Sequence, residues 1–342
     1  DVALILNGSP FEVSKTDTRL KLVQNLAKKQ NCAVAYVNLV GGQDDLIFDG
    51  NSFFVTSRGD LVARAAQFEV GNTVIDITSS TECVAEVLAN EKPDDLGEIW
   101  GALVLGLRDY IDKNGFKSVV LGLSGGIDSA VCAVLAADAI GGSRVFGVSM
   151  PSKYSSGHSK DDAADLANRI GCNYRTEVIE AMVDAFEGQL HLDGLASENL
   201  QARMRGVILM ALSNSEGHLT LTTGNKTELA VGYSTIYGDS VGGFAPIKDV
   251  EKTLVWRLAE WRNARASELG QTPPIPENSI SKPPSAELRP DQVDQDSLPP
   301  YEELDALLDA YIERRLGRDQ IIAEGFDAST VDRIIGLVDR AE

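Results

Sequence analysis

Residues 118–129 read SVVLGLSGGIDS, and an apolar segment that predicts a helix over 128–140 follows them. The apolar run 118–123 predicts a buried strand, so the order is strand, Gly-rich turn and helix. Such a unit leaves main-chain N–H groups and a helix N-terminus at the end of a strand, where they attract a phosphate or a diphosphate. The paired glycines let phosphate oxygens approach the main chain closely. The stretch therefore predicts a phosphate loop, although it has neither Walker nor GxGxxG spacing.

The same alternation of strand and helix continues on both sides of this stretch. Because apolar strands separated by helices are typical of parallel sheets covered on both faces, the pattern predicts a doubly wound α/β domain. Helix 159–170 is expected to be capped by Ser159. Further strands are predicted over 144–149, 174–179 and 218–223, and further helices over 95–114, 181–190, 198–214 and 225–231.

Residues 1–78 predict a different, mostly β region. A strand over 2–6 and a helix over 15–30 precede strands over 33–38, 52–57, 61–66 and 73–78. The letters RGD at 58–60 predict a hairpin turn. We expect three segments: a first domain over 1–78, a linker with a short helix over 79–95, and a second domain over 96–342.

Two segments carry further expectations. Residues 272–300 are rich in proline and predict a lid, a binding loop or a flexible tether. The chain starts inside a strand of core character and closes on an uncapped helix over 331–342, so we expect it to be part of a longer polypeptide.

The composition excludes several classes of protein. A net charge of −20 disfavours binding to nucleic acids or to anionic membranes, and no apolar run reaches the roughly 18 residues of a membrane span. The 4 cysteines lack CxxC spacing, which favours thiols in a reducing cytoplasm over a zinc site or a disulfide framework. An anionic substrate would need a local basic island, for which we expect Arg203, Arg205, Lys226, Lys248 and Lys252.

Three later clusters carry polar residues. Residues 198–203 read ENLQAR and place Asn199 and Arg203 on one helix face beside small residues, where a ligand could approach closely; a solvated face is the alternative. Residues 282–290 read KPPSAELRP and alone predict only a rigid polar loop.

Residues 223–228 read TGNKTE, in which Asn225 and Glu228 have the spacing of a capping box. Alternatively, Glu228 is a carboxylate at a strand end, as Asp128 is, and the strand ends of a doubly wound sheet line one crevice. Two carboxylates beside phosphate oxygens suit Mg²⁺. Residues 233–239 (YSTIYGD) then form a Gly-containing loop.

The SGGIDS stretch resembles the loop of the ATP pyrophosphatases, which cleave ATP between its α and β phosphates. Together with ENLQAR, TGNKTE, YSTIYGD and KPPSAELRP it resembles the bacterial glutamine-dependent NAD synthetases. The resemblance implies ATP, Mg²⁺ and deamido-NAD as ligands and a homo-oligomer as the assembly. It implies that Asp128 and Glu228 hold the metal and that Asn199, Arg203 and Glu228 contact deamido-NAD. It implies that ATP binds to Gly122, Leu123, Ser124, Gly125, Gly126, Ile127, Asp128, Ser129, Thr223, Lys252 and Ser285.

Residues 1–78 resemble the second half of a nitrilase-like amidase, an α-β-β-α sandwich that releases ammonia from glutamine. Ser9 and Lys15 match glutamine-binding positions, whereas no residue of this chain matches the amidase nucleophile.

The implied reaction is the amidation of deamido-NAD to NAD. The carboxylate is activated as an adenylate, pyrophosphate and AMP are released, and glutamine hydrolysis supplies the ammonia. Two alternatives remain at this point: another amide-forming ATP pyrophosphatase such as GMP synthetase, and a non-catalytic nucleotide-binding module.

Overall fold

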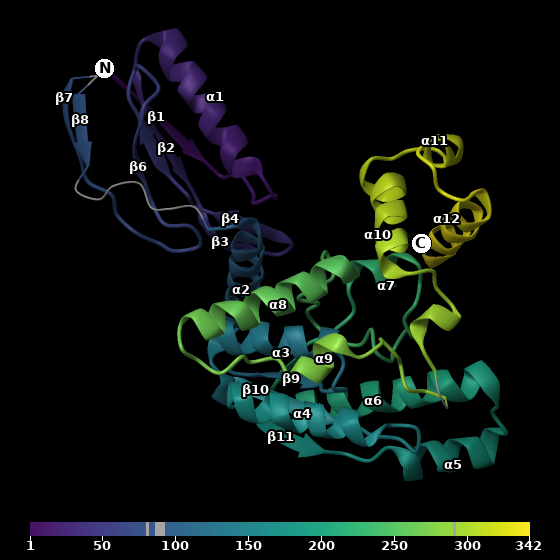
Figure 1. Cartoon of the computed structure of the whole chain (residues 1–342). Helices are drawn as coiled ribbons and strands as arrows, with labels where there is room; N and C mark the ends of the chain where they lie inside the picture. The colour runs from purple at the N-terminus through teal and green to yellow at the C-terminus, as the bar shows by residue number, and fades with distance from the viewer. Residues whose placement is uncertain (80–81, 86–92, 290–291) are drawn as a thin grey trace. The chain divides into compact units, whose positions relative to one another are not determined.

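The chain divides after Asn114 into two units, Asp1–Asn114 and Gly115–Glu342. The first unit is drawn from purple to blue and the second from blue-teal to yellow in Figure 1. The computed structural model describes residues 1–79, 82–85, 93–289 and 292–342. No helix among these residues combines the length and the apolar character that crossing a membrane requires.

A four-stranded sheet in the order β1-β2-β5-β6 organises the first unit. Strand β2 pairs in parallel with β1 and antiparallel with β5, and β5 and β6 form the hairpin that the RGD turn predicts. Helix α1 covers one face, where Val23 and Ala27 pack near Val34 and Val55. The bounds are β1 (Val2–Asn7), α1 (Lys15–Gln30), β2 (Ala33–Asn38), β5 (Phe53–Val55) and β6 (Leu61–Arg64).

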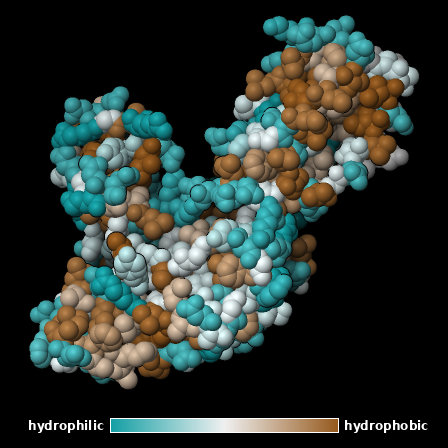
Figure 2. All heavy atoms as spheres, turned by 180° about the vertical axis from the view of Figure 1, so that it is seen from behind, coloured by the Kyte–Doolittle hydropathy of each residue, from teal (hydrophilic) through white to brown (hydrophobic). Residues whose placement is uncertain are grey.

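The opposite face of this sheet carries exposed apolar side chains. Leu4 and Leu6 on β1 are 73% and 81% exposed, and Val37, which is paired with Leu6 in the sheet register, is 45% exposed. Because side chains alternate along a strand, all three lie on the face away from α1. Figure 2 shows hydrophobic residues gathered over this unit.

Two hairpins complete the first unit: β3 (Val40–Gln43) with β4 (Leu46–Asp49), and β7 (Ile75–Ser79) with β8 (Glu82–Ala85). Strand β8 stands where the sequence predicted a linker with a short helix. Residues 80–81 and 86–92 of that linker lie outside the described residues.

Helix α2 (Asp95–Lys113) packs against β3 and β4, and Asp109 Oδ2 accepts a hydrogen bond from Gly42 N at 2.8 Å. This packing places α2 in the first unit, whereas the sequence-based boundary assigned the helix to the second domain. The domain boundaries 1–78, 79–95 and 96–342 stay a prediction.

A parallel four-stranded sheet in the order β11-β10-β9-β12 lies at the centre of the second unit, as predicted. Its strands are β9 (Val119–Gly122), β10 (Val145–Ser149), β11 (Asn173–Thr176) and β12 (Leu219–Thr220). Helices α5 (Glu180–Leu190) and α6 (Gly194–Glu216) pack over Val120 and Val148 on one face. The carboxyl ends of the strands therefore share one edge, at which the loop after β9 emerges.

Helix α3 (Ile127–Ile140) is buried on nearly all sides, because it packs against the sheet and against helices α4 (Gly157–Ile170) and α8 (Lys252–Glu268). Its Cys132 is fully buried, and burial together with the charges of Asp128 and Glu228 raises the pKa of that thiol well above its usual range. The cap of α4 is Ser156, whose side chain accepts from Ser159 N at 3.1 Å. The predicted cap, Ser159, lies inside the helix, because the helix begins two residues earlier than expected.

The end of the chain forms a helical layer around Tyr301, Leu304 and Ile334. Its helices are α10 (Tyr301–Leu308), a π-helical turn (Asp309–Glu313), α11 (Arg318–Ala323) and α12 (Ala328–Ala341). The proline-rich segment 272–300 contains the short helix α9 (Glu277–Ser281) and a 3₁₀ turn (Asp294–Asp296).

Candidate active site

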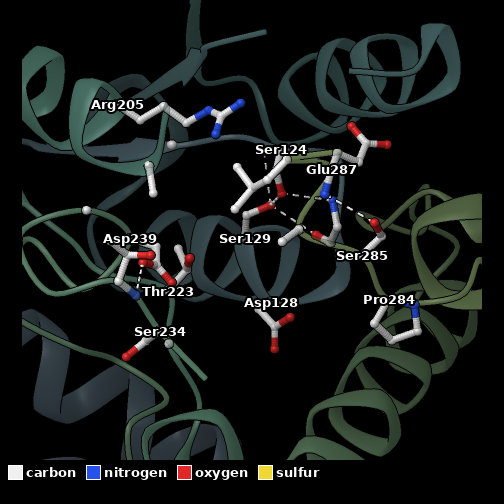
Figure 3. Close-up of a pocket in the computed structure, with 18 of the residues that line it drawn as sticks. Ser124, Asp128, Ser129, Arg205, Thr223, Ser234, Asp239, Pro284, Ser285 and Glu287 are labelled. Carbon is white, nitrogen blue, oxygen red and sulfur yellow. Dashed lines mark hydrogen bonds between the residues drawn. The ribbon is translucent and has the colours of Figure 1, made fainter. Parts of the chain in front are cut away.

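The phosphate loop joins β9 to α3. Gly125 has a φ of +79°, and a Cβ at this position would lie 2.4 Å from the main-chain oxygen of Ser159. Only glycine avoids both the strain and the collision. Ser129 Oγ donates to Gly126 O at 3.0 Å and lies 3.2 Å from Ser124 Oγ, which fixes the curve of the loop (Figure 3).

The first turn of α3 points at the same loop. Gly126 is the N-cap and offers no side-chain cap, so the first N–H groups of this 14-residue helix have no cap from that position. These groups and the helix dipole together favour an anion at the helix N-terminus. The loop can therefore bind a phosphate without any lysine of its own.

A buried ammonium lies between two carboxylates next to this loop. Lys252 Nζ is 2.5 Å from Asp128 Oδ2 and 2.8 Å from Glu228 Oε1. Burial alone would lower the pKa of Lys252, but the charges of Asp128 and Glu228 outweigh it and raise that pKa. Burial and then the charge of Asp128 raise the pKa of Glu228 to about 7, against the opposing effect of Lys252. The two carboxylates thus converge on one cation.

Asn225 connects the two acidic groups. Its Nδ2 donates to Asp128 Oδ1 at 2.8 Å, and its Oδ1 accepts from Glu228 N at 2.9 Å as the cap of α7 (Lys226–Ala230). The capping interpretation of TGNKTE is thus confirmed for Asn225. The Glu228 side chain, instead of completing the box, turns to Lys252, so both interpretations of this segment hold in part.

The donor set is compatible with Mg²⁺ supplied together with a nucleotide. Within the described residues, no group of three His, Cys, Asp or Glu side chains could hold a metal. Asp128 and Glu228, however, face one cation position together, and Mg²⁺ usually takes one or two carboxylates and completes its shell with phosphate oxygens and water.

Most of the predicted site residues line one cavity of about 430 Å³ in the second unit. They are Gly122, Leu123, Ser124, Gly126, Ile127, Asp128, Ser129, Asn199, Thr223, Glu228, Lys252 and Ser285. Gly125 is buried behind the loop surface. Arg203 is exposed, does not line the cavity, and donates from Nε to Ile236 O at 3.2 Å. The individual assignments of these residues to ATP or deamido-NAD remain predictions.

The predicted glutamine-binding residues lie in the first unit, before and at the start of α1. Ser9 Oγ accepts from Arg19 Nε at 3.0 Å, and buried Arg19 pairs with Asp49 at 2.7 Å. Lys15 pairs with Glu12 at 3.3 Å. The structure thus gives Ser9 a role in holding a buried ion pair.

Glu287 was missed by sequence reasoning. It lines the cavity, and its Oε1 accepts from Ser156 Oγ at 3.0 Å and from Ser159 Oγ at 2.7 Å. The KPPSAELRP segment is therefore tied to the start of α4. Its sequence signalled a rigid polar loop but not where the carboxylate attaches.

Asp294 follows the KPPSAELRP segment, and nothing in the sequence assigned it a role in the site. This buried carboxylate lines the cavity and accepts from Tyr301 Oη at 2.7 Å and Tyr233 Oη at 3.3 Å. The Tyr301 ring in turn lies 5.3 Å from Lys252 Nζ, within cation–π range. The proline-rich segment thus supports the ammonium at the centre of the site.

A family model described as NAD synthase matches residues 99–342, which include the whole cavity. The chain belongs to the NAD synthase family. The glutamine-dependent NAD(+) synthetase of Acinetobacter baylyi is 47% identical over 348 residues, covering 100% of this chain and 64% of that relative.

Two solved structures are also similar to this chain. Glutamine-dependent NAD+ synthetase from Acinetobacter baumannii, in complex with ADP, has a TM-score of 0.78 and 44% identity, covering 99% of this chain and 62% of that one. NMN synthetase from Francisella tularensis has a TM-score of 0.61 and 27% identity, covering 73% of this chain and 95% of that one. The chain therefore spans less than two thirds of the length of the glutamine-dependent relatives.

Proposed function

We propose that the second unit catalyses the ATP-dependent amidation of deamido-NAD to NAD. The observation that carries this proposal is the convergence of the phosphate loop, Asp128, Glu228 and Lys252 on one cavity. Family membership supports the substrate class, and the ADP complex of a relative supports ATP as the nucleotide.

The chemistry requires activation of a poor electrophile. The nicotinate carboxylate resists ammonia because its charge is delocalised and its oxygen leaves poorly. In the proposed first step a carboxylate oxygen attacks the α-phosphorus of ATP, and the bond to the β-phosphate oxygen breaks to release pyrophosphate. In the second step the nitrogen of ammonia attacks the acyl carbon, the bond to AMP breaks, and a proton leaves the nitrogen.

Residues of this chain would stabilise the charge that moves onto the diphosphate. The N–H groups at the start of α3 and the hydroxyls of Ser124 and Ser129 face the leaving group. Asp128 and Glu228 would hold Mg²⁺, which when bound supplies a positive charge to the phosphate oxygens. Lys252 keeps these two carboxylates together in the absence of a ligand.

The nitrogen source lies outside this cavity in our proposal. Free ammonia at neutral pH is mostly protonated to ammonium, which is a poor nucleophile. In our proposal glutamine hydrolysis in an amidase domain would therefore supply the ammonia. Residues 1–78 would form part of that domain, with Ser9 and Lys15 near the glutamine. Residues 96–342 would form the synthetase domain.

The test is NAD formation by the chain with deamido-NAD, ATP, Mg²⁺ and ammonium chloride, with release of AMP and pyrophosphate followed separately. Ammonium serves as donor because no amidase nucleophile is assigned in this chain. We expect pyrophosphate release to depend on deamido-NAD. Release that depends instead on xanthosine monophosphate would contradict the proposal.

The similarity to an NMN synthetase favours one second candidate, amidation of nicotinate mononucleotide at the same site. A direct comparison of kcat/KM for the mononucleotide and the dinucleotide separates the two. We expect the dinucleotide to be preferred. A clear preference for the mononucleotide would instead identify the mononucleotide as the substrate.

A further inference from the structure

The cavity of the second unit is acidic overall. Its described lining includes six carboxylates and four cations. The carboxylates are Asp128, Glu198, Glu228, Asp239, Glu287 and Asp294, and the cations are Lys160, Arg205, Lys252 and Lys282. An anionic ligand therefore depends on whichever cations the protein itself does not neutralise.

Three of these cations are neutralised by carboxylates or screened by solvent. Lys252 is shared by two carboxylates, and Lys282 pairs with Asp162 at 3.1 Å. Lys160 is exposed, where solvent screens its charge. Arg205 remains as the partly buried cation of the lining.

Arg205 projects from α6 and is anchored at one nitrogen. Its Nε donates to Met150 O at 3.0 Å, and no carboxylate among the described residues lies within 4 Å of its guanidinium. Burial lowers the pKa of Arg205 to about 10, while the more distant Glu287 and Asp239 act in the opposite direction. In Figure 3 the side chain extends toward the part of the cavity where Ser124 lies.

The Arg205 guanidinium thus has no anionic partner among the described residues. An unpaired buried charge is unfavourable, whereas a phosphate accepts two parallel hydrogen bonds from the planar fork of an arginine. Because Nε is already fixed by Met150, the terminal nitrogens are oriented before any ligand arrives.

We propose that Arg205 binds a phosphate group of the nucleotide substrate through its terminal guanidinium nitrogens, opposite the phosphate loop. This inference rests on the proposed function, because it assigns the anion in the same cavity. The phosphate can come from ATP or from the diphosphate of the dinucleotide, and the experiment separates these sources.

The test is calorimetric titration of the 342-residue chain and its variants with Mg²⁺-ATP, with deamido-NAD and with adenosine. We expect Arg205→Met to weaken binding of one phosphate-bearing ligand by about tenfold or more, with adenosine unaffected. Arg205→Lys keeps the charge without the fork and should weaken the same ligand by about threefold. Arg265→Met, an exposed arginine on α8, is the matched control and should bind as the unaltered chain does.

Two outcomes would overturn the inference: both ligands binding to Arg205→Met within about twofold of the unaltered chain, or adenosine binding weakened as much as ATP binding. If Arg205→Met does not fold, Arg205→Lys decides by the same criteria. A separate assay of NAD formation by the unaltered chain keeps the two proposals distinguishable. Its failure would contradict the proposed function, whereas the titrations would still report on Arg205.

Discussion

Asn225 Nδ2 donates a hydrogen bond to Asp128 Oδ1 across a distance of 2.8 Å, which ties the cap of α7 to the first turn of α3. The two residues lie 97 positions apart in the chain. Asn225 is fully buried, so its amide has no water to replace either partner. A helix cap and the orientation of a proposed metal ligand thus depend on one side chain.

Two substitutions separate these roles. Asn225→Ala removes both bonds and should lower the free energy of unfolding by about 2 kcal/mol. Asn225→Asp keeps an oxygen that accepts from Glu228 N but places a second charge beside Asp128. We expect this variant to lose NAD formation while α7 stays capped. Activity assays and thermal unfolding measure the two effects, and normal activity in Asn225→Asp would remove the orienting role.

Lys252→Met should reveal the cation position between the carboxylates. Loss of the ammonium leaves Asp128 and Glu228 facing each other, which should cost about 3–5 kcal/mol of stability. We expect added Mg²⁺ to raise the melting temperature of this variant more than that of the unaltered chain. An equal response to Mg²⁺ in both proteins would contradict the shared cation position.

Gly125→Ala should disrupt the phosphate loop without touching the core. The new Cβ would meet Ser159 O at 2.4 Å at a φ of +79°, so the loop must shift. Displacement of the loop by about 1 Å can cost roughly 100-fold in kcat/KM. Gly157→Ala is the control, because a Cβ there meets no atom within 4 Å. Equal activity in the two variants would show that the loop geometry is not limiting.

Glu287→Gln should loosen the segment over the cavity. Glu287 has a φ of +49°, and its carboxylate accepts from two serines at the start of α4. We expect a higher KM for ATP and faster proteolysis within 272–300. The exposed Glu277 provides the control, Glu277→Gln. Proteolysis at the same rate in both variants would show that the hydrogen bonds from Glu287 to the start of α4 do not hold this segment in place.

Local signals were sufficient to predict the parallel sheet and the Gly-rich turn between β9 and α3. The helix over 15–30 and the strand over 33–38 match α1 and β2 residue for residue, because α1 carries apolar residues at helical spacing and β2 is a short, nearly continuous apolar run. The hairpin of β3 and β4 was missed. Its strands are short and carry Gly41 and Gly42, and neither strand shows an apolar alternation.

The site residues show where sequence reasoning stops. Arg203 and Arg205 are two positions apart on a helix, so they point in well-separated directions, and the sequence cannot tell which one faces the cavity. The structure places Arg205 there, although Arg203 was the one assigned to substrate. Lys226, another expected member of the basic island, pairs with Glu313 at 2.5 Å, a partner 87 positions away.

The fully buried Cys132 lies one helical turn beyond Asp128 on α3. A thiol reagent can reach it only when that helix parts from the sheet or from α8. The rate at which this cysteine is labelled therefore reports how often α3 opens. A ligand that holds the phosphate loop closed should lower that labelling rate.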